Sequence, residues 1–144
     1  MDKPEIAASE VLEMMVKNDR FSRWLGLVVD EYRLGYCKLH YQVTEQMLNG
    51  FDIAHGGIIF SAADSAFAFA CNSHGRIALA LDASINFTRP AKLGDRLTVE
   101  AKEVHLGNKI SLYEIRVSNQ NSELVAVFNG TAYRTSKALI PATD

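Results

Sequence analysis

One stretch limits what this chain can fold into. The run Ile58–Cys71 has the length of a helix and is apolar on nearly every face, and a helix without a polar face has to be covered on all sides. Its one ionisable residue is Asp64, and no Lys or Arg occurs between Phe51 and Gly75. A carboxylate in apolar surroundings costs free energy unless something compensates it. Asp64 is therefore either a buried residue satisfied by nearby donors or a functional group.

The composition is that of one globular domain covering residues 1–144. Hydrophobic residues make up 48% and charged residues 22% of the chain, which is enough apolar material for a core. The net charge of -2 gives no reason to expect nucleic acid or a membrane as partner. The start, Met1–Glu5, lacks a basic segment followed by an apolar one, and the run at 58–71 is too short to cross a bilayer. We therefore expect a cytoplasmic protein.

Neither the cysteines nor the histidines predict a metal site. Cys37 and Cys71 match no zinc or redox spacing, so we expect two buried free thiols. The four histidines show no ligand spacing either; they are His40, His55, His74 and His105.

The first part of the chain predicts a helical segment and then a hairpin. Residues 1–24 form the helical segment, in which Asp2 caps a helix that ends near Asn18-Asp19. The apolar residues Phe21, Trp24 and Leu25 then form a hook that docks this helix. Residues 27–43 alternate apolar and polar side chains around a turn at 34–35, which is typical of a β-hairpin with one wet face.

The part after the apolar helix predicts a series of strands. We expect the helix to end at Gly75. Alternating segments follow, with turns near 93–95, 107–108 and 119–122 and a bulge near Val104. The last strand continues toward Tyr133, and residues 137–144 form a loose tail. The segment Val125–Val127 of this last strand is apolar on both faces, so we expect a second subunit to cover the outer face of the strand.

The separation of helices and strands along the chain predicts an α+β fold. Five or six antiparallel strands can curl around the apolar helix and cover it. The helix is preceded by His55, Gly56 and Gly57. Two glycines at a helix start allow a ligand to approach the backbone closely, and they leave free N–H groups at the positive end of the helix dipole.

A long antiparallel sheet around one helix is the hotdog fold, and the motifs of this chain resemble the PaaI-type acyl-CoA thioesterases associated with phenylacetate catabolism. The matching segments are Met47–Gly50, His55–Gly57, Ala63–Ala68, Asn72-Ser73, Ile85–Pro90 and Gly94-Asp95. They extend over roughly residues 20 to 135, and their combination is more specific than His-Gly-Gly alone. Two positions depart from the pattern: Phe51 stands where His is frequent, and Asn86 stands where Asp is frequent.

The resemblance implies roles for four residues in thioester hydrolysis. Asp64 acts as general base or nucleophile, and the Gly56 N–H polarises the thioester carbonyl with help from the helix dipole. His55 either orients this loop or binds near the carbonyl. Asn49 either holds the attacking water or is simply the turn residue of an Asn-Gly pair.

Other residues are candidates for binding the substrate, an aromatic (phenylacetyl- or hydroxyphenylacetyl-like) or medium-chain acyl-CoA. Three cations near turns are either phosphate ligands for CoA or ordinary surface charges: Arg89, Lys92 and Lys109. Four apolar residues either line an acyl pocket or belong to the core: Met47, Phe60, Phe67 and Phe69.

In hotdog thioesterases the site lies between two subunits, so Asp64 of one chain would face the His55-Gly56 loop of the other. The resemblance thus implies a homodimer, commonly paired into a homotetramer, with acyl-CoA as substrate and no cofactor. One alternative is a hydroxyacyl-thioester dehydratase, which has a Pro-rich loop beside its His; no Pro lies between Pro4 and Pro90. Another is a non-catalytic acyl-CoA-binding module, which only an activity measurement distinguishes.

Overall fold

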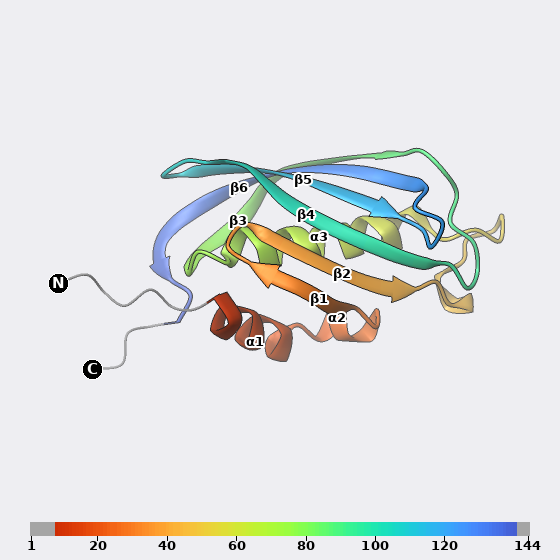
Figure 1. Cartoon of the computed structure of the whole chain (residues 1–144), viewed down its shortest axis with the longest axis horizontal. Helices are drawn as coiled ribbons and strands as arrows, with labels where there is room; N and C mark the ends of the chain where they lie inside the picture. The colour runs from red at the N-terminus through yellow and green to blue at the C-terminus, as the bar shows by residue number, and fades with distance from the viewer. Residues whose placement is uncertain (1–7, 141–144) are drawn as a thin grey trace.

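A computed structural model describes residues 8–140 as one curled sheet around a long helix (Figure 1). The elements are α1 (Ala8–Asn18), α2 (Arg20–Trp24), β1 (Val28–Arg33), β2 (Tyr36–Gln42), a 3-10 turn at Glu45–Met47, α3 (Gly56–Asn72), β3 (Arg76–Phe87), β4 (Arg96–Leu106), β5 (Ile110–Ser118) and β6 (Leu124–Ala138). The expected α+β architecture, with an antiparallel sheet around one helix, is confirmed.

The six strands follow the order β1-β2-β4-β5-β6-β3, and every neighbouring pair is antiparallel. One row of paired residues crosses four strands at Leu39, Val99, Val117 and Ala126, all with 0% exposure. Because side chains alternate along a strand, this row marks the concave face that packs on α3. The predicted bulge is present, since the register shifts between Glu103 and His105.

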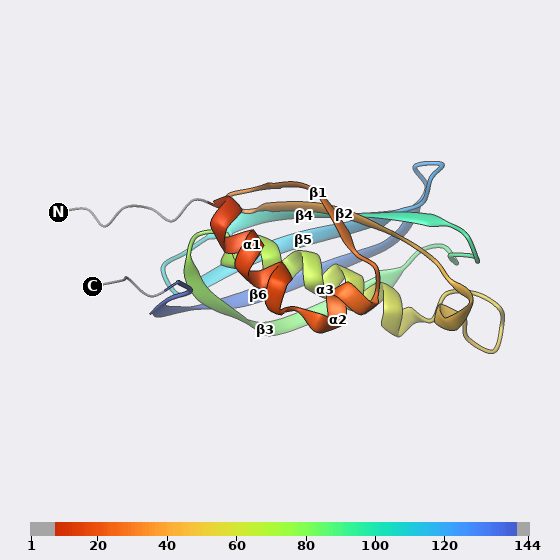
Figure 2. The ribbon, with the colours of Figure 1, turned by 90° about the horizontal axis from the view of Figure 1, so that it is seen from below.

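Helix α3 lies between the sheet and the pair α1–α2, which crosses it on the side away from the sheet (Figure 2). One stripe of α3 stays at least partly exposed, at Gly57, Ser61, Asp64 and Ala68. The sheet and the pair α1–α2 therefore leave this stripe, which contains Asp64, uncovered within the single chain.

The helix also ends before Gly75. The Asn72 side chain donates to the Ala78 carbonyl (3.1 Å) and accepts from the Ala78 N–H (2.9 Å). The last helical residue thereby starts β3, and Gly75 occupies the following turn with a positive φ of 86°.

The two terminal segments differ in part from the prediction. The Asp2 cap lies outside the described residues. Of the three hook residues, Leu25 is buried (2% exposed), but Phe21 and Trp24 are 51% and 66% exposed. Strand β6 reaches Ala138, which pairs with Arg76, so residues 137 and 138 belong to the sheet and not to the expected tail.

The segment Val125–Val127, which was expected to need a covering subunit, is largely buried within one chain. Val125 is 0% exposed, and its carbonyl accepts from the Thr88 N–H (2.9 Å). Exposed apolar side chains occur on several strands, among them Leu79, Leu81 and Phe87 of the edge strand β3, which are 59%, 61% and 52% exposed. A covering second subunit stays a prediction.

Cys37 and Cys71 are buried free thiols, as predicted. Within residues 8–140 no helix is long and apolar enough to cross a membrane. The same part of the chain contains no group of three or more His, Cys, Asp or Glu side chains placed to hold a metal ion.

Candidate active site

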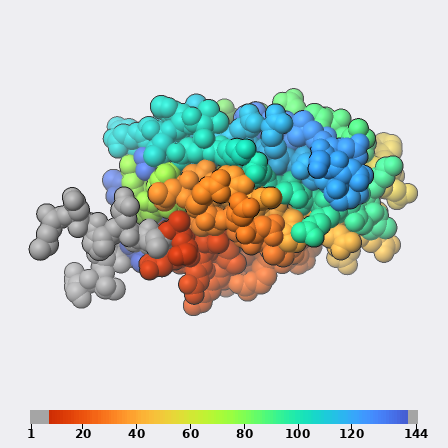
Figure 3. Space-filling model, in the orientation of Figure 1, coloured from red at the N-terminus to blue at the C-terminus, as the bar shows by residue number. Residues whose placement is uncertain are grey.

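The loop before α3 is fixed by contacts with a distant segment. The Ala54 N–H donates to the Ala91 carbonyl (2.8 Å), and Ile53 forms a β-bridge with Lys92. The His55 N–H donates to the Met47 carbonyl (2.8 Å). Loop 48–55 and segment 88–95 therefore lie together at one end of the molecule, on the right in Figures 1 and 3.

His55 is the N-cap of α3 and orients the helix start. Its Nδ1 accepts a hydrogen bond from the Gly57 N–H (2.9 Å). In the neutral ring the proton is then on Nε2. Two roles were considered for His55: orienting this loop, or binding near the thioester carbonyl. Its bond to the Gly57 N–H corresponds to the first.

The Gly56 amide is the free donor of the first helical turn. The Gly57 N–H bonds the His55 side chain, and the Ile58 and Ile59 N–H groups bond the His55 carbonyl (3.0 and 3.4 Å). Among the described residues the Gly56 N–H has no partner. It stands at the positive end of a 17-residue helix, where a developing negative charge is stabilised.

This end of α3 opens into a hollow of about 310 Å³. Gly56, Asn49, Phe87 and Arg89 line it. A Cβ atom at position 56 would lie 3.1 Å from Phe87 Cζ, so the ring closes one wall against the glycine. The contribution of Phe87 to the hollow was not predicted; its signals in the sequence were the alternation of β3 and its place in the motif segment Ile85–Pro90.

Asn49 is a turn residue that also lines the hollow. Its Oδ1 accepts from the Phe51 N–H (2.9 Å) and from the Ile53 N–H (3.4 Å). The side-chain carbonyl is thus used by the turn, and the Nδ2 group is the part of Asn49 available to a ligand.

Asp64 lies in the middle of the exposed stripe of α3 and is half-buried. Burial, and secondly the charge of Asp19, raise the pKa of Asp64 above its ordinary value. No hydrogen bond or ion pair to its carboxylate is found within residues 8–140. Donors from residues 8–140 therefore do not satisfy this carboxylate.

Asp64 and Gly56 do not meet within one chain. They are eight residues apart on the same helix, which is about 12 Å along the axis. The candidate residues therefore form two separate groups, one around the hollow and one at Asp64.

Two of the three candidate cations lie near the hollow. Arg89 lines it and forms an ion pair with Glu123 (3.0 Å). Lys92 is exposed on the segment that pins the loop.

Lys109 lies at the opposite end of the sheet. It precedes Ile110, which pairs with Tyr133 of β6, whereas Phe87 beside the hollow pairs with Ala126. Seven residues of β6 separate these pairs, or about 23 Å. A single chain therefore does not bring Lys109 to the hollow.

Most of the candidate acyl-pocket residues belong to the core. Met47, Phe67 and Phe69 are buried, and the Phe67 ring packs on Tyr113 and Phe128. Phe60 is only partly buried, and it remains a candidate for contact with a ligand.

Comparison with known proteins places the chain among thioesterases. A family model described as the Thioesterase superfamily matches residues 51–126. The acyl-coenzyme A thioesterase PaaI of Escherichia coli K12 is 42% identical over 120 residues, which are 83% of this chain and 86% of the relative. The medium/long-chain acyl-CoA thioesterase YigI of Salmonella typhimurium is 26% identical, covering 88% of this chain and 93% of the relative.

Solved structures agree with this fold. The E. coli PaaI protein of the phenylacetic acid degradation operon superposes with a TM-score of 0.89 and 39% identity, over 91% of this chain and 95% of that one. The Streptococcus mutans UA159 protein smu.793, solved with bound acetyl CoA, gives a TM-score of 0.76 and 30% identity, over 78% and 90%.

Proposed function

We propose a mechanism and a substrate class from the premise that this chain belongs to the thioesterase superfamily and is a PaaI-type acyl-CoA thioesterase with the hotdog fold. The substrates are aromatic or medium-chain acyl-CoA thioesters, hydrolysed in the cytoplasm to free acid and CoA. Water is the second substrate, and no cofactor takes part. The observation that carries the mechanism is the unpaired Gly56 N–H beside a hollow at the positive end of α3.

The Gly56 N–H binds the thioester oxygen and stabilises the oxyanion of the tetrahedral intermediate. Asp64 supplies the second function. It either removes a proton from the attacking water or attacks the carbonyl carbon itself. In the first route the C–S bond breaks as the tetrahedral intermediate collapses, and the proton that Asp64 took from water passes to the leaving sulfur. In the second route a mixed anhydride forms as the C–S bond breaks, and the CoA thiolate takes a proton from solvent. Water then hydrolyses the anhydride and restores the Asp64 carboxylate. The raised pKa of Asp64 makes its ionised form a stronger base.

The separation of Asp64 from Gly56 supports a site shared by two chains. A thioester carbon within reach of both groups requires Asp64 of one subunit and Gly56 of another. The edge strand β3 offers the contact, because it is 12 residues long, exposes Leu79 and Leu81, and contains no Pro or Lys. Antiparallel pairing of two such edges gives a two-fold homodimer. Following the family resemblance, two dimers form the homotetramer.

The two proposed kinds of acyl group are suggested by the relatives and by the apolar side chains near the hollow. The relative PaaI belongs to a phenylacetic acid degradation operon, and the relative YigI acts on medium and long chains. In this chain the Phe87 ring beside Gly56 and the partly exposed Phe60 offer apolar surface for either kind of acyl group.

The test is release of free thiol from a panel of phenylacetyl-, hydroxyphenylacetyl-, benzoyl- and straight-chain acyl-CoAs. Wild type and Asp64→Asn are compared, and the variant is expected to lose about 100-fold or more in kcat. Wild-type activity in the variant would make Asp64 structural. No thiol release from any substrate would favour the binding module, and hydration of an enoyl-CoA would favour the dehydratase.

The thermal stability of Asp64→Asn is the folding control. Because the pKa of Asp64 is raised in the folded chain, its contribution to stability is present at low pH and is lost as pH rises through the folded pKa. At neutral pH the neutral amide should therefore leave Tm unchanged or higher.

A further inference from the structure

A chain of three side chains joins α2 to α3 beside Asp64. The Ser22 Oγ donates to Asp19 Oδ2 (2.6 Å) and lies 2.7 Å from the Ser65 Oγ. Ser22 and Ser65 are buried, with 5% and 8% exposure. Asp19 also caps α2, because its Oδ1 accepts from the Ser22 N–H (2.9 Å). The residue at the far end of this chain, Ser65, directly follows Asp64.

The link decides how α2 sits on the central helix. Helix α2 has five residues, too few to be stable without tertiary contacts. The buried Ser22–Ser65 pair is its polar contact with α3, and it fixes Asp19 over the turn of α3 that carries Asp64. Asp19 is therefore placed to act on Asp64 through position and through charge.

The charge effect has one source among the described residues. Burial is the first cause of the raised pKa of Asp64, and Asp19 is the second and the only charged one. Three further charged residues of α1 and α2 line the groove that Asp19 and Ser22 share: Glu13, Lys17 and Arg23. The remaining charged residues of these two helices, Glu10 and Arg20, do not line it. On α3 itself, the pKa of the Cys71 thiol is raised first by burial and second by the charge of Asp64.

We propose that Asp19 is a positioning residue for the Asp64 site: the buried Ser22–Ser65 pair holds it beside Asp64, so that a second negative charge faces the carboxylate that acts on the thioester. This inference rests on the proposed function, in which Asp64 must be ionised to act. A neighbouring like charge favours proton binding by Asp64. The enzyme thereby gains a stronger base and requires a higher pH for activity.

The experiment compares the pH dependence of kcat/KM for the best acyl-CoA in wild type, Asp19→Asn and Ser22→Ala. Asn caps helices as well as Asp does, so Asp19→Asn removes the charge and keeps the cap. We expect the acidic limb of its pH profile, where kcat/KM falls as pH is lowered, to move to lower pH. At a pH on this limb, kcat/KM as a fraction of the plateau value should be about twofold or more higher in Asp19→Asn than in wild type. Ser22→Ala keeps the charge but removes the contact that holds Asp19 in place, so its limb should move in the same direction as that of Asp19→Asn by a smaller amount.

Controls separate this effect from general ones. Asp30→Asn removes an exposed carboxylate on β1 and should leave both limb and plateau unchanged. Asp19→Ser, another uncharged cap, should move the limb as Asp19→Asn does and stands in for it if that variant is unstable.

The outcomes distinguish this inference from the proposed function. An unmoved limb in Asp19→Asn and Asp19→Ser, with Asp64→Asn inactive, overturns the charge effect and leaves the proposed function standing. An unmoved limb in Ser22→Ala, with a moved limb in Asp19→Asn, overturns the positioning link. If the acidic limb of Asp30→Asn moves as far as that of Asp19→Asn, the movement reflects the net charge of the protein and not the position of Asp19, and the inference is overturned. Activity in Asp64→Asn overturns the proposed function itself.

Discussion

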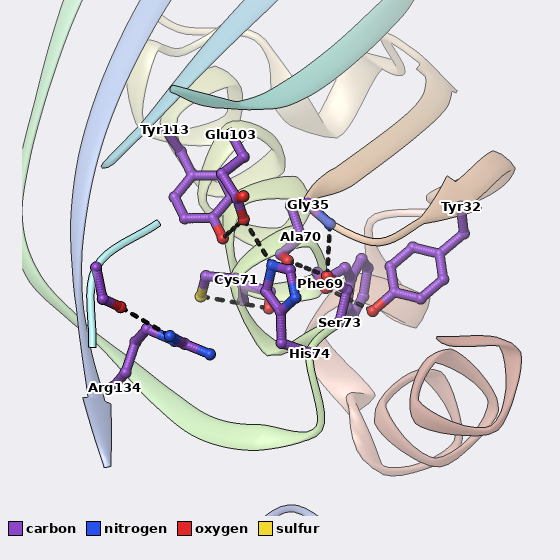
Figure 4. A network of polar contacts seen from close by, with 12 residues as sticks. Tyr32, Gly35, Phe69, Ala70, Cys71, Ser73, His74, Glu103, Tyr113 and Arg134 are labelled. Atoms are coloured by element: carbon purple, nitrogen blue, oxygen red, sulfur yellow. Dashed lines mark hydrogen bonds and ion pairs between the residues drawn. The ribbon is translucent and has the colours of Figure 1, made fainter. Parts of the chain in front are cut away.

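The two ends of α3 differ in how their backbone groups are satisfied. At the C-terminal end the polar groups of Figure 4 are paired closely. The Ser73 hydroxyl accepts from the Gly35 N–H (2.7 Å) and donates to the Ala70 carbonyl (2.6 Å). The Tyr32 hydroxyl donates to the Phe69 carbonyl (2.6 Å). The negative end of the helix is thus closed by donors from the chain itself.

A second layer completes this closed end. The Glu103 Oε2 accepts from the Tyr113 hydroxyl (2.7 Å) and lies 2.6 Å from His74 Nε2. Tyr113 is 2% exposed, and burial, together with Glu103, raises its pKa.

The N-terminal end is left open. His55 satisfies the donors of the first turn except the Gly56 N–H, which faces a hollow. A helix terminus of either kind needs partners for its free backbone groups. We therefore expect the closed C-terminal end to contribute stability and the open N-terminal end to bind the ligand. Three substitutions test this expectation.

The largest effect is expected from Gly56→Pro at the open end. Pro is well tolerated at the first position of a helix, and His55 already has the extended conformation (φ -60°, ψ 132°) that a following Pro requires. The variant loses the N–H and adds ring carbons, the first of which lies near Phe87. Because the oxyanion donor is lost, we expect kcat to fall about 100- to 1,000-fold. Gly56→Ala adds a Cβ near Phe87 but keeps the N–H, and it should lose much less.

Mixing two inactive variants sharpens this test. If the site is shared, a heterodimer of Gly56→Pro and Asp64→Asn chains contains one site with both defects and one with none. Activity should therefore reappear after the two proteins are denatured and refolded together. Its absence in a verified heterodimer would mean that both groups act within one chain.

At the closed end, Glu103→Ala should lower stability and leave activity intact. It removes the common acceptor of His74 and Tyr113, which should cost about 2–4 kcal/mol in the free energy of unfolding. Urea denaturation measures this loss, and kcat/KM should stay within about twofold of wild type where the variant is folded. The exposed Glu114→Ala, which breaks an ion pair with Arg116, is the control and should cost about 0.5 kcal/mol or less. A catalytic defect without a stability defect in Glu103→Ala would contradict the comparison.

The smallest effect is expected from Arg89→Ala at the rim of the open end. Its ion pair with Glu123 is exposed (51% and 37%), so stability should hardly change. Loss of a phosphate contact should raise KM for the acyl-CoA roughly three- to fivefold. The corresponding acyl-pantetheine, which lacks the phosphates, should show no change. Lys109→Ala is the matched control; an equal rise in its KM would mean that a partner subunit brings Lys109 to the hollow.

Much of the fold was predictable from local patterns. The apolar run identified the central helix, and alternation identified the strands, the hairpin and the bulge, because these features depend on neighbouring residues. The end of α3 was placed too late, since the Asn72 side chain bonds to Ala78 on the next strand. Phe21 and Trp24 were expected to be docked, but they are exposed. An apolar residue in a short helix does not reveal which side of that helix faces the core.

The candidate site residues came from the motif, and their placement comes from the structure. The motif pointed to Asn49, His55, Gly56 and Asp64. Asn49 and Gly56 line one hollow, His55 caps the helix beside it, and Asp64 lies apart from it. The wide separation of Lys109 from that hollow follows from the strand order.

The sequence by itself determined that one apolar helix with a single carboxylate had to lie inside a sheet, because only burial on most sides makes such a helix stable. Tertiary structure decided which of its groups stay unsatisfied. The Gly56 N–H is free because segment 91–92 fixes the preceding loop and His55 takes the neighbouring donor. Asp64 is half-buried beside Asp19 because Ser22 and Ser65 hold α2 in place. These contacts join residues far apart in the chain, and local periodicity does not encode them.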